Sequence, residues 1–442
     1  MNTGGGGGGG RGRGRGGGGG RGGYQGNFYA QPQQQQLQPG GFNQYPPNNN
    51  NPTFNNNSIP ASHGQSNSAF TKKPPRMAQH VKFVPGMHFN ICKVAQLVPS
   101  TVVTGFCLNL IPNPALPPGS APRVQLFTSA MDGSMIEFNC DTGLWQKSRG
   151  TIMPGPTTCV LAVDSWVFVA YLIGGDRGAI KAFNLSSGRE FVLMDGVGTQ
   201  TLDAAHLGKV TCMTVGNNML VTGGSDGQAK AWNFLGEDQG GWQLFGTFAS
   251  PLGNGEEISC MKPLPKLGLL FTCTTIGSIK MWRLNEGTLI GIFPNAHQGS
   301  ICGLDMLNVG LDQVFLLTAG LGDMFIRLWQ VNTNGLIPVH QVSTIPPSNP
   351  NYTSKPPVPL SAIKIIQTLG HQPEHQLFVG SQNGSINVYR LKSTTQFDRI
   401  GVVDGHQRFS KVVGFDVVPT GPGSQMMCAI TENGNVNWFG LE

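Results

Sequence analysis

One pattern of residues recurs seven times along the chain, and it restricts the possible folds more than any other feature. The clearest copy runs from Ala205 to Phe234 (AHLGKVTCMTVGNNMLVTGGSDGQAKAWNF), where an alternating apolar run precedes an S-D-G turn and a second run ends on Trp232. In every copy a turn position is followed five residues later by an aromatic residue: Gly133 to Phe138, Gly178 to Phe183, Gly227 to Trp232, Gly277 to Trp282, Met324 to Trp329, Gly384 to Tyr389 and Gly434 to Phe439. The turns lie 45, 49, 50, 47, 60 and 50 residues apart, which indicates a repeated supersecondary unit. Because aromatic residues make up only 8% of the chain, seven matches are not expected by chance.

Each unit alternates apolar residues with others before its aromatic residue, as Ile279 and Met281 do before Trp282. This period of two predicts half-buried strands. The glycine at the turn predicts a tight hairpin, because glycine adopts a positive φ without steric cost. We therefore expect one antiparallel sheet per unit.

The units resemble the WD40 repeats of a β-propeller. Two of them hold the family's hydrogen-bonded set of His, Ser/Thr, Asp and Trp. The third unit has His206, Thr222, Asp226 and Trp232, and the fifth has His297, Thr318, Asp323 and Trp329. Others depart from the pattern, since Ile276, Asn383 and Asn433 replace the Asp in units four, six and seven. The resemblance implies that the eight residues form structural networks within their blades.

The expected fold is all-β, with a seven-bladed WD40-type propeller over residues 83–442. The last unit ends on its third strand at Phe439, so we expect Met87 to Val94 (MHFNICKV) to supply the missing fourth strand. Closing the ring in this way removes open sheet edges. The segments SWVFVAYLIGG, VGNNMLVTGGSDG and HQLFVGSQNGSINVYRL are similar to plant proteins that join a CCCH zinc finger to WD repeats, although no such finger is visible here.

Residues 1–82 form the predicted leader, a low-complexity tail with a basic linker. The leader contains Gly4 to Gly10, Gln33 to Gln36 and Asn48 to Asn51, and its few aliphatic residues predict disorder because they cannot offset the entropy of ordering. It holds eight of the 29 Lys and Arg residues and no acidic residue, so 21 basic and 23 acidic residues remain in the predicted ring. The leader therefore accounts for all of the net charge of +6.

The start of the leader resembles an RGG box, the Arg-Gly segment of many RNA-binding proteins. Guanidinium groups can contact phosphates, and planar side chains can stack on unpaired bases. The candidate RNA-binding residues are Arg11, Arg13, Arg15, Arg21, Tyr24 and Phe28. The alternative is that this segment only solubilises the protein or associates with itself.

No catalytic or metal-binding pattern is visible. The nine cysteines form no C-x-x-C pair, and most lie in strand-like runs where Cys acts as a small apolar residue. Their odd number and the lack of a signal peptide favour the cytoplasm, the nucleus or both. The apolar runs are too short to span a bilayer. His206, His297 and His406 occupy equivalent positions, which favours a structural role over catalysis, and the strands expected to line the central channel look apolar and small.

We therefore interpret the chain as a noncatalytic protein-interaction scaffold with an RNA-binding tail that acts in messenger RNA or ribonucleoprotein metabolism. Its partners would be proteins on the rims of the propeller and RNA on the leader, with no cofactor, metal, membrane or small-molecule substrate. The alternative is a scaffold that binds only proteins, such as a ubiquitin-ligase receptor or a trafficking adaptor with a solubilising tail.

Overall fold

The computed structural model describes residues 82–83, 90–94, 101–111, 123–140, 145–195, 204–248, 256–309, 313–344, 358–367, 374–403, 410–421 and 424–441. By contacts the chain divides into two units, Met1–Thr71 and Lys72–Glu442, and every described residue belongs to the second. The predicted disorder of the leader concerns residues that lie almost wholly outside the described ranges, so it stays a prediction. So does the predicted boundary between residues 82 and 83.

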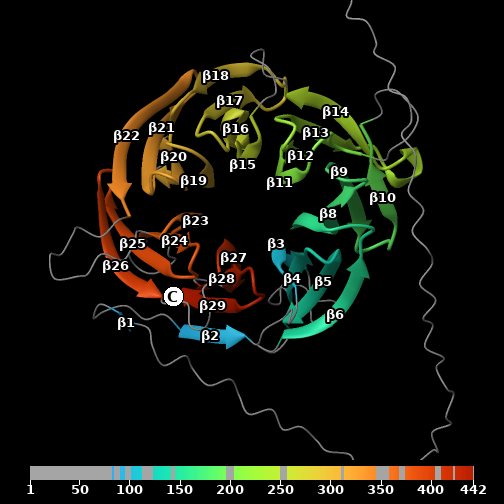
Figure 1. The fold of residues 1–442 in the computed structure, drawn as a ribbon, viewed down its shortest axis with the longest axis horizontal. Helices are drawn as coiled ribbons and strands as arrows, with labels where there is room; N and C mark the ends of the chain where they lie inside the picture. The colour runs from blue at the N-terminus through green and yellow to red at the C-terminus, as the bar shows by residue number, and fades with distance from the viewer. Residues whose placement is uncertain are drawn as a thin grey trace, which may run out of the picture. The chain divides into compact units, whose positions relative to one another are not determined.

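The second unit is a β-propeller of seven antiparallel sheets, which confirms the predicted fold class (Figure 1). Blades one and two consist of β3 (Val103–Ile111), β4 (Arg123–Ala130), β5 (Ser134–Cys140), β6 (Trp145–Ile152), β7 (Thr157–Val163), β8 (Trp166–Ile173), β9 (Arg177–Asn184) and β10 (Glu190–Leu193). Blades three and four consist of β11 (Val210–Gly216), β12 (Met219–Gly224), β13 (Ala229–Phe234), β14 (Trp242–Phe248), β15 (Ile258–Leu264), β16 (Leu269–Thr274), β17 (Ile279–Arg283) and β18 (Leu289–Phe293). Two 3-10 turns, η1 (Glu237–Gln239) and η2 (Pro265–Leu267), lie in the connections of these blades.

The remaining three blades complete the ring. Blades five and six consist of β19 (Ile301–Val309), β20 (Gln313–Gly320), β21 (Phe325–Asn332), β22 (Gly335–Ser343), β23 (Leu360–Gln367), β24 (His375–Ser381), β25 (Ile386–Ser393), β26 (Gln396–Val403) and a fifth strand, β1 (Lys82–Phe83). Blade seven consists of β27 (Val412–Gly421), β28 (Ser424–Thr431), β29 (Val436–Leu441) and β2 (Asn90–Val94). The innermost strands contact one another in cyclic order, β3, β7, β11, β15, β19, β23, β27 and again β3.

Ring closure follows the prediction. Strand β2 pairs antiparallel with β29, and Ile91 lies opposite Phe439. In Figure 1 the blue β2 runs beside the red β29, so an early strand completes the last sheet. The backbone hydrogen bonds of β29 are thereby satisfied on both edges.

The apolar core lies between the blades. Among the described residues seven buried clusters occur, and each joins two neighbouring blades. Trp232 and Trp282 are buried in two of these clusters, as the period-two pattern requires. The sheets therefore hold one another in place face to face, as expected for stacked repeats that cannot bury an apolar face alone.

The turn prediction holds in six blades and needs correction in one. Gly133, Gly227, Gly277, Gly384 and Gly434 all have positive φ. Gly178 does not. It lies within β9 and bridges to His206, and a Cβ there would come within 2.7 Å of the Gly208 carbonyl oxygen. Glycine is needed at this position for close backbone approach rather than for a left-handed turn. In blade five Met324 takes the turn position with a φ of 55°.

Candidate interaction sites

The candidate RNA-binding residues of the leader lie outside the described residues. These are Arg11, Arg13, Arg15, Arg21, Tyr24 and Phe28. Their role stays a prediction that rests on the sequence.

In blade three the structure brings together all four residues of the proposed network. His206 Nδ1 lies 3.1 Å from both carboxylate oxygens of Asp226, and its Nε2 lies 2.8 Å from Thr222 Oγ1. The indole of Trp232 donates to the same Thr222 oxygen at 3.0 Å. The Asp226 carboxylate also accepts the backbone N–H groups of Leu207 and Gln228. The network thus links the turn between β12 and β13 to the segment before β11.

Blade five repeats this geometry. His297 Nδ1 lies 3.1 Å from Asp323, its Nε2 lies 2.8 Å from Thr318 Oγ1, and Trp329 donates to that oxygen at 2.9 Å. Blade five has one more residue between Thr318 and Asp323 than blade three has between its Thr and Asp. This residue does not disturb the network, because Asp323 still accepts the backbone N–H of Phe325 two residues later.

The electrostatics favour a charged Asp in both networks and a neutral His in blade five. Burial tends to raise the pKa of Asp226 and of Asp323, but the hydrogen bonds from His206 and His297, the backbone N–H donors and the neighbouring charges together outweigh it and hold both pKa values below the ordinary 3.8. Burial lowers the pKa of His297, and the nearby Arg327 acts in the same direction, against the hydrogen bond that His297 donates to Asp323. Because both ring nitrogens of each histidine have protein partners, the geometry fits a structural role.

A cation supports each network, buried in blade three and partly buried in blade five, and sequence reasoning missed it. Lys230 donates to the carbonyl of Ala205 at 2.8 Å, and Arg327 donates to the carbonyl of Ala296. In both cases the acceptor directly precedes the network histidine. The two cations stand two residues before Trp232 and Trp329, and this shared spacing is the signal that could have revealed them.

The inner wall of the ring differs from the expectation of an apolar and small lining. The fifth residues of four consecutive inner strands alternate in charge: Lys262, Asp305, Lys364 and Asp416. Asp305 lies 2.8 Å from Lys262 Nζ and 3.9 Å from Lys364 Nζ, and it accepts the backbone N–H of Ile365 in the next blade. Asp416 accepts the N–H of Leu108 in the same way. These charges join neighbouring blades.

The charges of the inner wall compensate one another. Burial tends to raise the pKa of Asp305, but Lys364 and Lys262 lower it below its ordinary value. Burial tends to lower the pKa of Lys262, yet the carboxylate of Asp305 raises it. Both side chains are therefore held in their charged forms, which suits ion pairs rather than proton transfer.

The described cysteines are unsuited to nucleophilic or metal chemistry. Burial raises the pKa of Cys159 and of Cys302 to about 12, so their thiols stay protonated at neutral pH. No group of three or more His, Cys, Asp or Glu residues that could hold a metal ion occurs in the part of the chain that the structure describes. Likewise, no described helix is long and apolar enough to cross a membrane.

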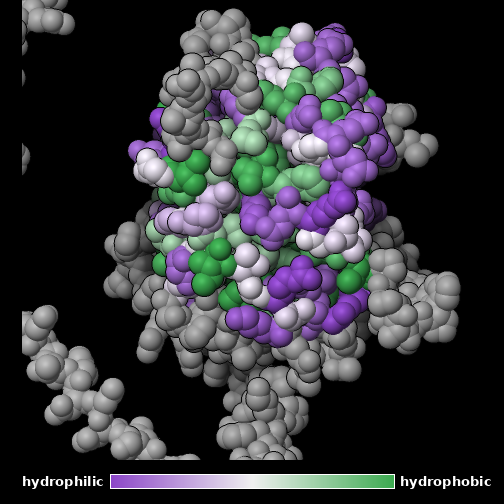
Figure 2. Space-filling model, turned by 90° about the vertical axis from the view of Figure 1, so that its right-hand side faces the viewer, coloured by the Kyte–Doolittle hydropathy of each residue, from purple (hydrophilic) through white to green (hydrophobic). Residues whose placement is uncertain are grey.

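Exposed apolar side chains concentrate on one face of the ring. We call it the network face, because it carries the histidine-bearing connections between blades and the turns between each blade's second and third strands. Of the twelve large apolar side chains that are exposed among the described residues, seven lie there: Val102, Met131, Ile152, Met194, Leu207, Ile276 and Val358. On the side of the ring seen in Figure 2, by contrast, apolar residues are interspersed with hydrophilic ones. These side chains come from separate connections and turns around the ring, so they offer several apolar contact points on this face rather than one continuous patch.

Comparison with known families agrees with the geometry of blade three. The family model "WD domain, G-beta repeat" matches residues 197–233, which include His206, Thr222, Asp226 and Trp232. The chain contains a WD40 repeat. The WD40 family generally provides noncatalytic scaffolds for protein interactions.

Two curated plant proteins are similar to part of this chain. Zinc finger CCCH domain-containing protein 62 from Arabidopsis thaliana is 28% identical over 171 residues, which are 39% of this chain and 36% of that protein. Zinc finger CCCH domain-containing protein 59 from the same plant is 26% identical over 171 residues, 39% of this chain and 31% of that protein. The similar segment thus spans about a third of each relative. These matches confirm the similarity expected from the sequence.

Proposed function

We propose that this WD40-repeat protein is a noncatalytic scaffold that binds proteins on its ring and RNA through its leader, within messenger RNA or ribonucleoprotein metabolism. One observation carries the proposal, namely the separation of charge along the sequence. The leader holds eight basic and no acidic residues, whereas the rest of the chain holds 21 basic and 23 acidic residues.

The leader has the chemistry that unpaired RNA requires. Arginines separated by glycine can each contact a phosphate, and binding of this kind depends steeply on salt concentration. Tyr24 and Phe28 offer rings on which bases can stack without sequence preference. The ring supports the protein-binding half of the proposal, because its network face exposes apolar side chains that a partner can cover. Joining both activities in one chain raises the local concentration of each ligand for the other.

Ultraviolet crosslinking of the full chain to single-stranded RNA tests the leader. Replacing Arg11, Arg13, Arg15 and Arg21 by alanine should abolish most of the crosslinking, and replacing them by lysine should retain part of it, because charge remains while stacking is lost. A control variant removes four exposed basic side chains of the ring, Lys147, Arg149, Arg177 and Lys266, and should crosslink like the parent. If both leader variants also crosslink like the parent, the RNA-binding role is wrong.

The exposed apolar side chains of the network face favour a second candidate, a scaffold that binds only proteins. Ribonuclease treatment of material that copurifies with the full chain separates the two. Under our proposal part of that material is released by ribonuclease, whereas a protein-only scaffold retains all of it.

A further inference from the structure

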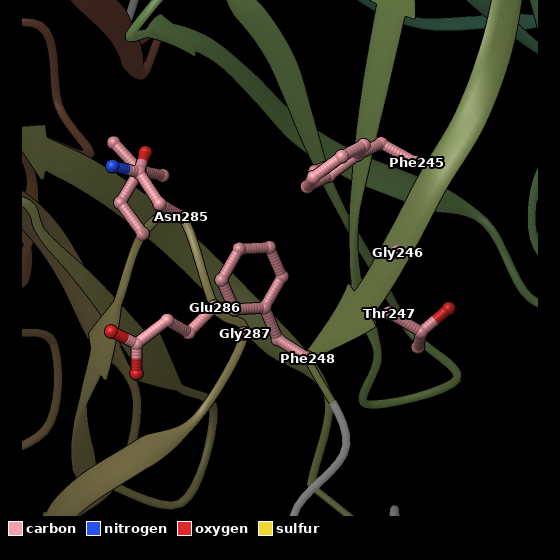
Figure 3. Close-up of a pocket in the computed structure, with 9 residues that line it drawn as sticks. Phe245, Gly246, Thr247, Phe248, Asn285, Glu286 and Gly287 are labelled. Carbon is pink, nitrogen blue, oxygen red and sulfur yellow. The ribbon is translucent and has the colours of Figure 1, made fainter.

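A groove opens on the outer side of the ring, where blade three meets blade four. It has a volume of about 240 Å³ and is lined by Ala231, Phe245, Gly246, Thr247, Phe248, Leu284, Asn285, Glu286 and Gly287. Figure 3 shows the rings of Phe245 and Phe248 projecting from β14 toward the connection between β17 and β18. The Glu286 carboxylate points away from these rings, so the two phenylalanine rings form the apolar part of the groove.

Phe245 differs from its equivalents in other blades. The register between β13 and β14 shifts so that Gly246 lies opposite Ala231 and Leu244 opposite Trp232, which leaves Phe245 as a bulged residue. The side chain of Phe245 is 56% exposed. In blades four, five and six the corresponding bulged residues pack against buried clusters: Ile290, Val339 and Ile400. Among blades three to six, blade three alone leaves its bulged apolar side chain uncovered by other described residues.

The space beside this bulge is also open. A Cβ atom built on Gly246 would have no neighbour within 4 Å. At the equivalent position of blade four, a Cβ on Gly291 would touch the ring of Phe293 at 3.4 Å. The space that blade four fills with its own side chain is therefore left for another group in blade three.

The strand that borders the groove has a free edge. Strand β14 is the last strand of its sheet, and no described strand pairs with its outer side. Blade six shows what such an edge accepts, because β1 adds to the outer strand β26 with Lys82 opposite Val402. A backbone in extended conformation satisfies the free N–H and C=O groups of an edge strand.

The charges at the groove favour a polypeptide over a nucleic acid. Glu286 lies 3.8 Å from Arg283, so the carboxylate in the groove wall is balanced by a neighbouring cation. Asn285 accepts a hydrogen bond from Asn217 at 2.8 Å. No excess positive charge lines the groove to attract phosphates, whereas an uncharged strand edge beside the exposed ring of Phe245 suits an extended segment that carries an apolar side chain.

We propose that an extended segment of a partner protein pairs with the outer edge of β14 and places an aromatic or aliphatic side chain in the groove beside Phe245. This surface is separate from the network face and from the leader, so the inference goes beyond the proposed function and does not depend on RNA binding. Affinity would come from backbone pairing and specificity from the single anchored side chain.

Selection from a phage-displayed library of linear 16-residue peptides on the full chain tests this inference. We expect the selected peptides to share one aromatic or aliphatic position, and a synthetic consensus peptide to slow amide hydrogen exchange in β14. Gly246→Leu fills the open space, and Phe245→Asp removes the apolar wall. Each should weaken binding of the synthetic peptide at least tenfold.

The control is Ile337→Asp, which changes an apolar residue of similar exposure (50%) on the outer strand β22 and should leave affinity within twofold. A side chain at position 246 meets no neighbour, and Phe245 is largely exposed, so both variants should keep the parent's melting temperature. The inference is overturned if no shared position emerges, or if neither groove variant weakens the peptide. It is equally overturned if Gly246→Leu abolishes self-association of the chain or binding of a labelled RNA oligonucleotide instead, because the occupant would then be a second copy or RNA.

Discussion

Blades three and four each form a four-stranded antiparallel sheet of the same topology, but they differ in their buried polar side chains. Blade three holds the full set of His206, Asp226, Thr222 and Trp232. Blade four keeps only the hydrogen bond from Trp282 to Thr272 at 3.0 Å, and Ile276 stands exposed where blade three has its aspartate. The sheet therefore forms without the complete polar network.

Packing between blades accounts for this tolerance. One buried cluster contains Val221 and Ala231 of blade three together with Leu270 and Trp282 of blade four. Because the apolar faces of both sheets are removed from water in the same contact, the alternation of apolar residues sets the fold. The polar network then adds local stability where it is present.

The largest effect should come from the two buried indoles. Trp232→Ala and Trp282→Ala each delete a side chain that is at most 2% exposed, which costs about 3–5 kcal/mol through lost burial and the cavity left behind. We expect similar losses in the free energy of unfolding, measured by denaturant titration. A much smaller loss for Trp282→Ala would show that the network, rather than packing, stabilises blade three.

The contribution of the polar network should appear as a smaller difference in the free energy of unfolding between two threonine variants. Thr222→Val removes the partner of both His206 and Trp232, whereas Thr272→Val removes only that of Trp282. Each buried donor or acceptor left unpaired costs roughly 1–3 kcal/mol, so Thr222→Val should destabilise the ring about twice as much. Equal costs in the same titration would mean that the histidine contributes nothing.

Mild acid should weaken blade five through its network histidine. The pKa of His297 in the folded ring lies below its ordinary 6.5, mainly because of burial. Between these two pKa values the unfolded chain binds a proton that the folded chain does not, so stability falls as pH falls below 6.5. Melting temperatures at pH 7.5 and 5.5 should differ less for His297→Gln than for the parent, and an equal difference would argue against this origin.

The smallest effect should follow from restoring the aspartate in blade four. Ile276 is 57% exposed. The backbone N–H of Ser278, which a new aspartate at position 276 could otherwise accept, already donates to the Thr274 hydroxyl at 3.0 Å. Ile276→Asp should therefore change the free energy of unfolding, measured by the same denaturant titration, by no more than about 0.5 kcal/mol. A gain above about 1 kcal/mol would reveal a partner for the new carboxylate.

Local patterns were sufficient to predict the sheets and their number. The alternation of apolar residues before Trp232 and its six equivalents indicates which side chains of each strand are buried. Because the last repeat ends at Phe439 without a fourth strand, the sequence also predicts that an early segment completes that sheet, as β2 does. Features created by the packing of one blade on the next were not predictable, because they depend on residues about 40 to 50 positions apart. Lys262 and Asp305 each look like an isolated charge in a strand, and only the contact between blades four and five pairs them. The groove beside Phe245 likewise depends on the connection of the next blade.

The most direct test of the account copies blade four's residue into blade three. Asp226→Ile breaks the network but leaves every apolar contact between the strands in place. Hydrogen–deuterium exchange measured on the folded variant should show that amides of β12 and β13 keep protection comparable with those of β16 and β17. Selective loss of protection in blade three, with the neighbouring blades unchanged, would contradict the claim that interblade packing determines the sheet.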